Sequence, residues 1–227
     1  AFKRQKELTG DASHELRGPL AVIQAETTLA LQRERDPASY RKSLEIVAQE
    51  GDYMVAVLNQ LLTLARADSG KDQMTFQVVE LAHFLEDLCE NMAILCGEKN
   101  QTLHQELHDP LTIKGDPQAL RNMMVNLLTN AIRYTAEGGT ITVSLYRERT
   151  MVVIAVSDTG MGIPSHELPH IFKRFYRVDK ARSREAGGSG LGLAICHHIA
   201  HGHGGTIQVE SRVNRGSTFR VRFPLWG

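Results

Sequence analysis

The chain has 227 residues, of which 42% are hydrophobic and 23% charged, and these values are typical of a globular protein with a sizeable core. Lys plus Arg and Asp plus Glu both number 26, so the net charge is zero and the strongly basic surface of a nucleic-acid-binding protein is not expected. The three cysteines, Cys89, Cys96 and Cys196, form no CxxC pair, which favours reduced thiols in an intracellular chain over a disulfide framework. The longest purely apolar run, residues 151–156, is far shorter than the roughly 20 residues that cross a bilayer.

The first third of the chain is predicted to form two long helices. The chain begins in mid-pattern without Met or a signal peptide, so we expect a fragment whose first helix continues upstream. Residues 33–37 interrupt the pattern, and there Asp36 can cap a second helix with Pro37 in its first turn. Apolar side chains recur at helical spacing in both segments: Ala12, Leu16, Leu20 and Ile23, then Leu44, Val47, Met54, Leu58, Leu61 and Leu64. Two helices alone make a thin core, so we predict a homodimer in which two hairpins form a four-helix bundle.

After residue 73 the pattern changes to mixed strands and helices. We predict strands at 74–79, 102–107, 111–114, 140–147, 151–158, 206–211 and 217–224, and helices at 80–96, 116–135 and 190–201. The fold class is therefore α+β, with a helical hairpin followed by a two-layer α/β domain. Residues 164–189 lack a clean period and are rich in Lys, Arg and Gly, which is typical of a long functional loop.

The segment 13–20, SHELRGPL, contains a candidate catalytic histidine. His14 lies two residues from both Ala12 and Leu16, and two residues turn a helix by about 200°, so we expect its side chain to project away from the apolar stripe. A neutral imidazole is a competent nucleophile near pH 7, and Glu15 is a candidate base beside it. A His–Glu pair alone favours the alternative that His14 is an ordinary exposed residue on the surface of a helix. Pro19 inside a helical run costs about 3 kcal/mol, and this cost indicates a functional constraint.

Asn126 and Asn130 are four residues apart and share one face of a predicted helix, with Arg133 and Tyr134 one turn later. Two carboxamide oxygens on one face can bind a hard cation such as Mg²⁺. The alternative is that these asparagines only cap or decorate the helix. Against it, the same helix carries core residues, namely Leu127, Leu128, Ala131 and Ile132. Its polar face is therefore expected to meet a polar ligand.

Two glycine-rich segments are candidate ligand contacts. Residues 158–164, DTGMGIP, follow an apolar strand, and Asp158 at the strand end can accept a hydrogen bond from an exocyclic amine. Gly160 and Gly162 would let the backbone approach a ligand, although this pattern alone is also typical of a turn. Residues 187–193, GGSGLGL, open a predicted helix whose free N–H groups favour phosphate. No strand runs directly into this segment and a P-loop lysine is absent, so neither a dinucleotide fingerprint nor a P-loop is predicted.

Taken in order, these motifs resemble those of the sensor histidine kinase family. The His14 segment resembles its H box, residues 126–134 its N box and residues 158–162 its first glycine box. Residues 172–177, FKRFYR, resemble its F box, and residues 188–192 its second glycine box. The resemblance covers nearly the whole chain.

The resemblance implies a dimerisation and phosphotransfer domain at 1–68 and an ATP-binding domain at 72–227, of the type shared with gyrase and heat-shock chaperones. It implies that His14 attacks the γ-phosphate of ATP and passes the phosphoryl group to an Asp of a response regulator, a transfer dominated by positioning and charge neutralisation. The resemblance implies that Asn130 and Asn126 bind Mg²⁺, that Asp158 binds adenine and that Tyr134 packs near the base. The phosphates would be contacted by Arg133 and Arg177 and by the backbone N–H groups of Gly190, Leu191 and Gly192. Further nucleotide contacts would come from Gly160, Gly162, Tyr176 and Gly188. Residues 164–189 would form a lid over ATP.

The same resemblance implies that the chain is the cytoplasmic domain of a bacterial sensor. A membrane would be reached only through a region upstream of this chain. One position departs from the family, which often has Thr or Asn four residues after the histidine, where this chain has Gly18. That position is tied to dephosphorylation of the regulator, and Gly offers no side chain to orient water, so phosphatase activity is in doubt.

Three alternatives remain open at this point. The first is an ATP hydrolase of the same nucleotide-binding fold, in which a Glu four residues before the Mg²⁺-binding Asn activates water; Asn126 occupies that position here. The second is a non-catalytic dimeric scaffold. The third is a zinc site formed by clustered histidines, His197, His198, His201 and His203, which lack an HExxH pattern. For these histidines we favour solvent exposure near a helix C-terminus.

Overall fold

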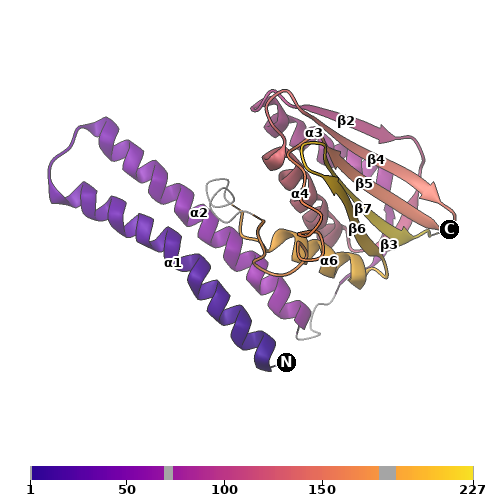
Figure 1. Cartoon of the computed structure of the whole chain (residues 1–227), viewed down its shortest axis with the longest axis horizontal. Helices are drawn as coiled ribbons and strands as arrows, with labels where there is room; N and C mark the ends of the chain where they lie inside the picture. The colour runs from indigo at the N-terminus through magenta and orange to yellow at the C-terminus, as the bar shows by residue number, and fades with distance from the viewer. Residues whose placement is uncertain (1, 69–73, 179–187, 227) are drawn as a thin grey trace.

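The computed structural model describes residues 2–68, 74–178 and 188–226, and in the first helix it describes side chains from residue 12 onward, His14 excepted. Helices α1 (Phe2–Gln32) and α2 (Pro37–Asp68) form an antiparallel hairpin (Figure 1). The carboxylate of Asp36 accepts hydrogen bonds from the N–H of Ser39 at 2.9 Å and from its hydroxyl at 2.6 Å, so the predicted cap is confirmed. Helix α1 continues through Pro19.

Although α1 and α2 contain 31 and 32 residues, their mixed polar sequences do not suit a lipid bilayer. Throughout the described part of the chain, we find no helix that combines the length and the apolar character required to cross a membrane.

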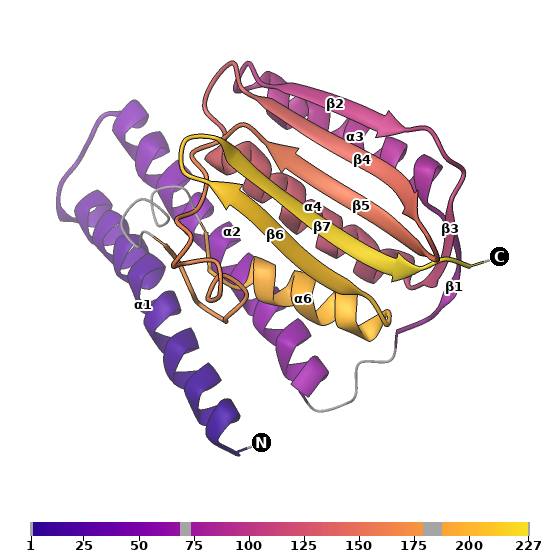
Figure 2. The same cartoon turned by 45° about the vertical axis from the view of Figure 1, so that its right-hand side comes forward.

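The remaining described residues form an α/β domain in which helices cover one face of a five-stranded sheet (Figure 2). The strands are β2 (Thr102–Leu107), β4 (Thr140–Glu148), β5 (Met151–Asp158), β6 (Thr206–Arg212) and β7 (Gly216–Pro224), in the order β2-β4-β5-β7-β6. Strand β2 pairs with β4 in parallel, and the other neighbours are antiparallel. The helices are α3 (Leu81–Gly97), α4 (Pro117–Tyr134) and α6 (Gly192–Gly202). The predicted α+β class is confirmed.

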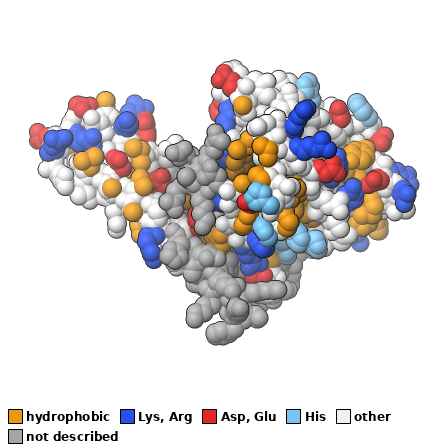
Figure 3. Space-filling view, viewed as in Figure 1, with side chains coloured by type: hydrophobic (Ala, Val, Ile, Leu, Met, Phe, Trp, Pro, Cys, Tyr) orange, Lys and Arg blue, Asp and Glu red, His pale blue; other side chains and the backbone are white. Residues whose placement is uncertain are grey.

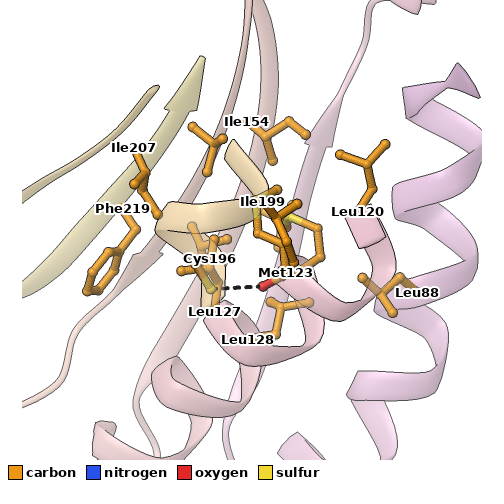
Figure 4. Close-up of a cluster of buried hydrophobic side chains, with 14 of the residues drawn as sticks. Leu88, Leu120, Met123, Leu127, Leu128, Ile154, Cys196, Ile199, Ile207 and Phe219 are labelled. Carbon is orange, nitrogen blue, oxygen red and sulfur yellow. Dashed lines mark hydrogen bonds between the residues drawn. The ribbon is translucent and has the colours of Figure 1, made fainter. Parts of the chain in front are cut away.

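The core of this domain lies between the sheet and the helices (Figure 4). Helix α4 contributes Leu120, Met123, Leu127 and Leu128, which pack with Cys196 and Ile199 of α6 and with Ile154, Ile207 and Phe219 of the sheet. Each such leucine stabilises the fold by roughly 1.5–3 kcal/mol through burial. The Cys196 thiol donates to the carbonyl of Met123 at 3.5 Å, and burial raises its pKa, so the thiol stays protonated and unreactive. The core therefore fixes α4 and α6 side by side under the sheet.

The boundaries of several elements differ from the sequence-based prediction, most clearly at residues 74–79. A strand from Met74 is wrong, because β1 (Gln77–Glu80) begins three residues later and pairs with β3 (Thr112–Gly115). Strand β3, the partner of β1, ends at Gly115, and the next residue, Asp116, is the N-cap of α4. The Asp116 carboxylate also accepts the N–H of Thr75 at 2.8 Å, and this bond replaces a ladder contact. Helix α6 likewise begins at Gly192 rather than at residue 190.

Candidate functional site

The asparagine face of α4 meets the start of α6. The side-chain amide of Asn126 donates to the backbone and side-chain oxygens of Asn122, at 2.8 and 2.9 Å. Its Oδ1 therefore faces Gly192, where an added Cβ would lie 2.6 Å from that oxygen. Asn130, one turn further along α4, is half-buried. The glycine at the start of α6 thus allows its backbone to lie directly against an amide oxygen of α4.

Asp158 lies at the end of β5 and is fixed by backbone groups. Its Oδ1 accepts the N–H of Gly160 at 2.8 Å and that of Ser217 on β7 at 3.3 Å. Burial raises the pKa of Asp158, and these two donors oppose the rise. The side chain lines a cavity of about 460 Å³ together with Leu168 and residues of β6 and β7. The sequence analysis missed Ser217, which lies 59 residues away along the chain.

The end of α4 is tied to the glycine segment that follows Asp158. The carbonyl of Tyr134 accepts the N–H of Met161 at 3.2 Å, and a Cβ on Gly160 would overlap that carbonyl. Gly162 has a φ of +68° and passes so close to the backbone of Arg212 that a side chain could not fit. The structure therefore brings Tyr134, Gly160 and Gly162 together around Asp158. Arg133, in the last turn of α4, is half-buried.

The second glycine segment packs against the F-box segment 172–177. Gly190 has a φ of +72°, and a Cβ there would lie 2.8 Å from the backbone of Phe175. The sequence analysis expected free N–H groups in this segment. Instead, the N–H of Leu191 donates to the Ser189 hydroxyl at 3.2 Å and is already hydrogen-bonded. Gly188 is buried, whereas Gly187 and the predicted lid residues 179–187 lie outside the described residues.

Arg177 lies against the helical hairpin. Its Nη2 donates to Oε2 of Glu15 on α1 at 2.8 Å and to the Tyr53 hydroxyl on α2 at 3.3 Å. The Arg177 side chain is only 6% exposed. Tyr176 donates its hydroxyl to the carboxylate of Glu167. Among the predicted site residues, the structure thus joins Glu15 to Arg177. His14 belongs to α1, but its side chain, and with it the predicted outward orientation, lies outside the described residues.

Two further contacts join the same surfaces of the hairpin and the α/β domain. Arg174 donates from both terminal nitrogens to the carboxylate of Asp68, each at 2.7 Å. The Ser189 hydroxyl donates to the side-chain carbonyl of Gln60 at 2.6 Å. Helix α2 also packs against α6 (Figure 2). The partners are separated by 106 and 129 residues, so no local pattern in the sequence predicts these contacts.

The clustered histidines do not form the metal site considered from the sequence. His203 is buried, which corrects the expectation of exposure at this position, and its Nε2 accepts the N–H of Asp116 at 2.9 Å. Its Nδ1 lies 2.8 Å from the carbonyl of Ile199, and burial lowers its pKa, so the ring is neutral with Nδ1 as the donor. The rings of His197 and His201 stack at 4.1 Å. Within the described ranges, no three His, Cys, Asp or Glu side chains are arranged to hold a metal.

The fold defines a class of protein in which a helical hairpin precedes an α/β domain with helices on one face of its sheet. The family model "His Kinase A (phospho-acceptor) domain" matches residues 4–70. The family model "Histidine kinase-, DNA gyrase B-, and HSP90-like ATPase" matches residues 115–227. The chain belongs to the sensor histidine kinase family, as its motifs predicted.

Several known proteins are similar to the chain over nearly all of its length. It is 34% identical to the sensor histidine kinase RppB of Synechocystis sp., over 100% of this chain and 50% of that protein. It is 36% identical to the signal transduction histidine-protein kinase ArlS of Staphylococcus epidermidis, over 99% of this chain and 49% of that protein. The chain therefore spans about half the length of the curated relatives that it matches.

Two solved structures share the fold. Histidine kinase AdeS of Acinetobacter baumannii matches with a TM-score of 0.75 and 20% identity, covering 94% of this chain and 98% of that one. Histidine kinase ThkA, in complex with the response regulator protein TrrA, matches with a TM-score of 0.78 and 23% identity, covering 98% of this chain and 63% of that one.

Proposed function

We propose that this chain is the catalytic core of a protein-histidine kinase, which transfers the γ-phosphoryl group of ATP to His14 and then to an Asp of a response regulator. One observation supports the proposal above the others. The asparagine face of α4, the Asp158 loop and the start of α6 converge on one side of the α/β domain, and the hairpin that carries His14 and Glu15 is docked beside them.

In the proposed complex, the nucleotide base occupies the cavity beside Asp158. The Asp158 carboxylate accepts a hydrogen bond from the adenine amine, and Tyr134 packs near the base. Gly160, Gly162, Gly188 and Tyr176 make further contacts with the nucleotide. Arg133 and Arg177 contact the phosphates, as do the backbone N–H groups of the segment 190–192, where the Leu191 N–H must first leave the Ser189 hydroxyl.

The residues of α4 fit a magnesium ion. The Asn126 amide nitrogen is held by Asn122, so its oxygen, which lies beside Gly192 at the start of α6, is the atom available as a ligand. Asn130 adds a second amide oxygen on the same helix face. We propose that Asn130 and Asn126 hold Mg²⁺, which when bound neutralises charge on the phosphate oxygens.

In the proposed reaction, an imidazole nitrogen of His14 forms a bond to the γ-phosphorus while the bond from that phosphorus to the β-phosphate oxygen breaks, and ADP leaves. Glu15 accepts the ring proton of His14 as the general base. In this structure the Glu15 carboxylate is paired with Arg177, so Arg177 must release Glu15 before that step.

We also propose a homodimer and a response regulator as partners. Exposed apolar side chains along the hairpin support the dimer: Leu20, Leu31, Leu44, Val55, Leu58 and Leu62. Apolar side chains are visible along the hairpin among charged ones (Figure 3). The solved structure of ThkA with TrrA supports the second partner. The greater length of the relatives supports a larger sensor with this chain as its cytoplasmic part, anchored to a membrane through an upstream region.

A hydrolase of the same fold would need a carboxylate on α4 to activate water. The sequence of α4, PQALRNMMVNLLTNAIRY, contains no Asp or Glu, and Asn126 stands at the relevant position. This observation favours transfer to a histidine over hydrolysis.

The test is labelling with γ-³²P-ATP and Mg²⁺ of the wild-type chain and of His14→Ala. We expect acid-labile, alkali-stable phosphate on the wild type and none on the variant, while both bind a non-hydrolysable ATP analogue with equal affinity. Labelled His14→Ala would overturn the assignment of His14. Release of free phosphate without phosphoprotein would favour the hydrolase, and failure to bind the analogue would favour the scaffold.

A further inference from the structure

Arg177 is buried but only partly hydrogen-bonded. Its Nη2 contacts Glu15 at 2.8 Å and Tyr53 at 3.3 Å, yet its Nε is buried without a hydrogen-bond partner among the described residues. A guanidinium has five N–H donors, and leaving a buried donor unpaired is unfavourable. A phosphate pairs with two parallel N–H groups of an arginine at once. The contact with Glu15 is therefore one that a phosphate ligand can replace.

Tyr53 links the two charged groups from a third element. Its hydroxyl lies 3.4 Å from Oε2 of Glu15 and accepts from Arg177 at 3.3 Å. Burial raises the pKa of Tyr53, so the hydroxyl is protonated near neutral pH and can donate to Glu15. Its ring packs against the core independently of these bonds. The hydroxyl thus joins α2 to both Glu15 and Arg177.

The docking of the two domains does not depend on Tyr53 alone. Arg174 binds Asp68 through two hydrogen bonds, and Ser189 binds Gln60, on the same side of the hairpin. Loss of the Tyr53 hydroxyl should therefore leave the domains in contact. Its local effect falls on the pairing of Arg177 with Glu15.

We propose that Tyr53 is a positioning residue that holds Arg177 on Glu15 and so withholds Arg177 from the phosphates of ATP. The inference rests on the proposed function, in which Arg177 contacts phosphate and Glu15 accepts the proton of His14. While the three groups are joined, the phosphate contact and the base are both occupied. When Arg177 moves to the phosphates, both become available together.

The test compares Tyr53→Phe with the wild type. The variant keeps the ring and loses only the hydroxyl, with its two long hydrogen bonds to Glu15 and Arg177. We therefore expect the Mg²⁺-dependent affinity for a non-hydrolysable ATP analogue to rise about 2- to 10-fold. The initial rate of autophosphorylation at subsaturating ATP should rise with it. Tyr40→Phe is the matched control, because the Tyr40 hydroxyl also lies on α2 and donates to a backbone carbonyl, that of Arg33, at 3.5 Å. We expect this control to bind and react as the wild type does.

An Arg177→Gln background shows whether the effect passes through Arg177. There, Tyr53→Phe should change neither nucleotide affinity nor rate, because the group that it restrains is gone. Unchanged or weaker binding by Tyr53→Phe overturns the inference, as does an equal effect in both backgrounds. A wild type that binds ATP without forming phosphohistidine contradicts the proposed function instead, since the binding comparison does not require phosphoryl transfer.

Discussion

Asp158 combines a proposed adenine contact with an unfavourable burial. Burial raises its pKa in the folded state above the ordinary value of 3.8. At pH values between 3.8 and the raised pKa of the folded state, the folded chain binds more protons than the unfolded chain. The free energy of unfolding therefore falls as pH rises through this window. At neutral pH the ionised carboxylate therefore lowers stability, so a contribution to stability does not explain an Asp at this position.

We predict that Asp158→Asn weakens binding of an ATP analogue about 10- to 100-fold, because a charged acceptor for the adenine amine is lost. The melting temperature at pH 7 should not fall, because the variant has no charge to bury. Isothermal titration and thermal unfolding measure the two effects. Asp109→Asn, at an exposed acid of the same domain, is the control and should change neither. Wild-type affinity in Asp158→Asn would contradict the adenine contact.

Single residues were predictable from the sequence where they belong to a short motif. Asp158 and Gly160 lie two residues apart, and the structure joins them directly. Tyr53 was not predictable, because its partners Glu15 and Arg177 lie 38 and 124 residues away. Arg177 was assigned to phosphate from its motif alone, since no sequence pattern indicates how two domains dock.

At the scale of elements, the relation between α4 and α6 determines the proposed metal site. Hydrophobic periodicity predicted both helices, because each has a continuous buried face. Their ends were less predictable, since they depend on tertiary contacts. Helix α4 begins after Asp116, whose N–H binds His203 beyond the end of α6. That contact, 87 residues away along the chain, has no local signal.

We predict that Gly192→Ala weakens Mg²⁺-dependent ATP binding about tenfold or more, because the new Cβ would lie 2.6 Å from Oδ1 of Asn126 and displace it. Titrations with Mg²⁺ and with EDTA separate the metal-dependent part. Gly97→Ala is the control, since a Cβ there meets no atom within 4 Å. This control should keep wild-type affinity. Equal binding by Gly192→Ala would argue against Asn126 as a magnesium ligand.

At the scale of the whole molecule, the hairpin leaves apolar side chains that the single chain does not cover. Leu44, Val55, Leu58 and Leu62 share one face of α2, with exposed fractions of 67, 58, 45 and 54%. The sequence analysis placed Leu44 and Leu58 on an apolar stripe and inferred that a second copy buries it. A large exposed apolar stripe is unfavourable in water, which supports that inference.

We therefore predict that the chain sediments as a dimer, with twice the chain mass of 25.2 kDa, and that Leu58→Glu converts it to a monomer. A charge at this position would be buried without a partner in a four-helix bundle, at a cost of several kcal/mol. Ile94→Glu is the matched control, because Ile94 is 68% exposed on α3, away from the hairpin. That variant should remain dimeric. A monomeric wild type at tens of micromolar, or a dimeric Leu58→Glu, would show that this stripe is not the dimer interface.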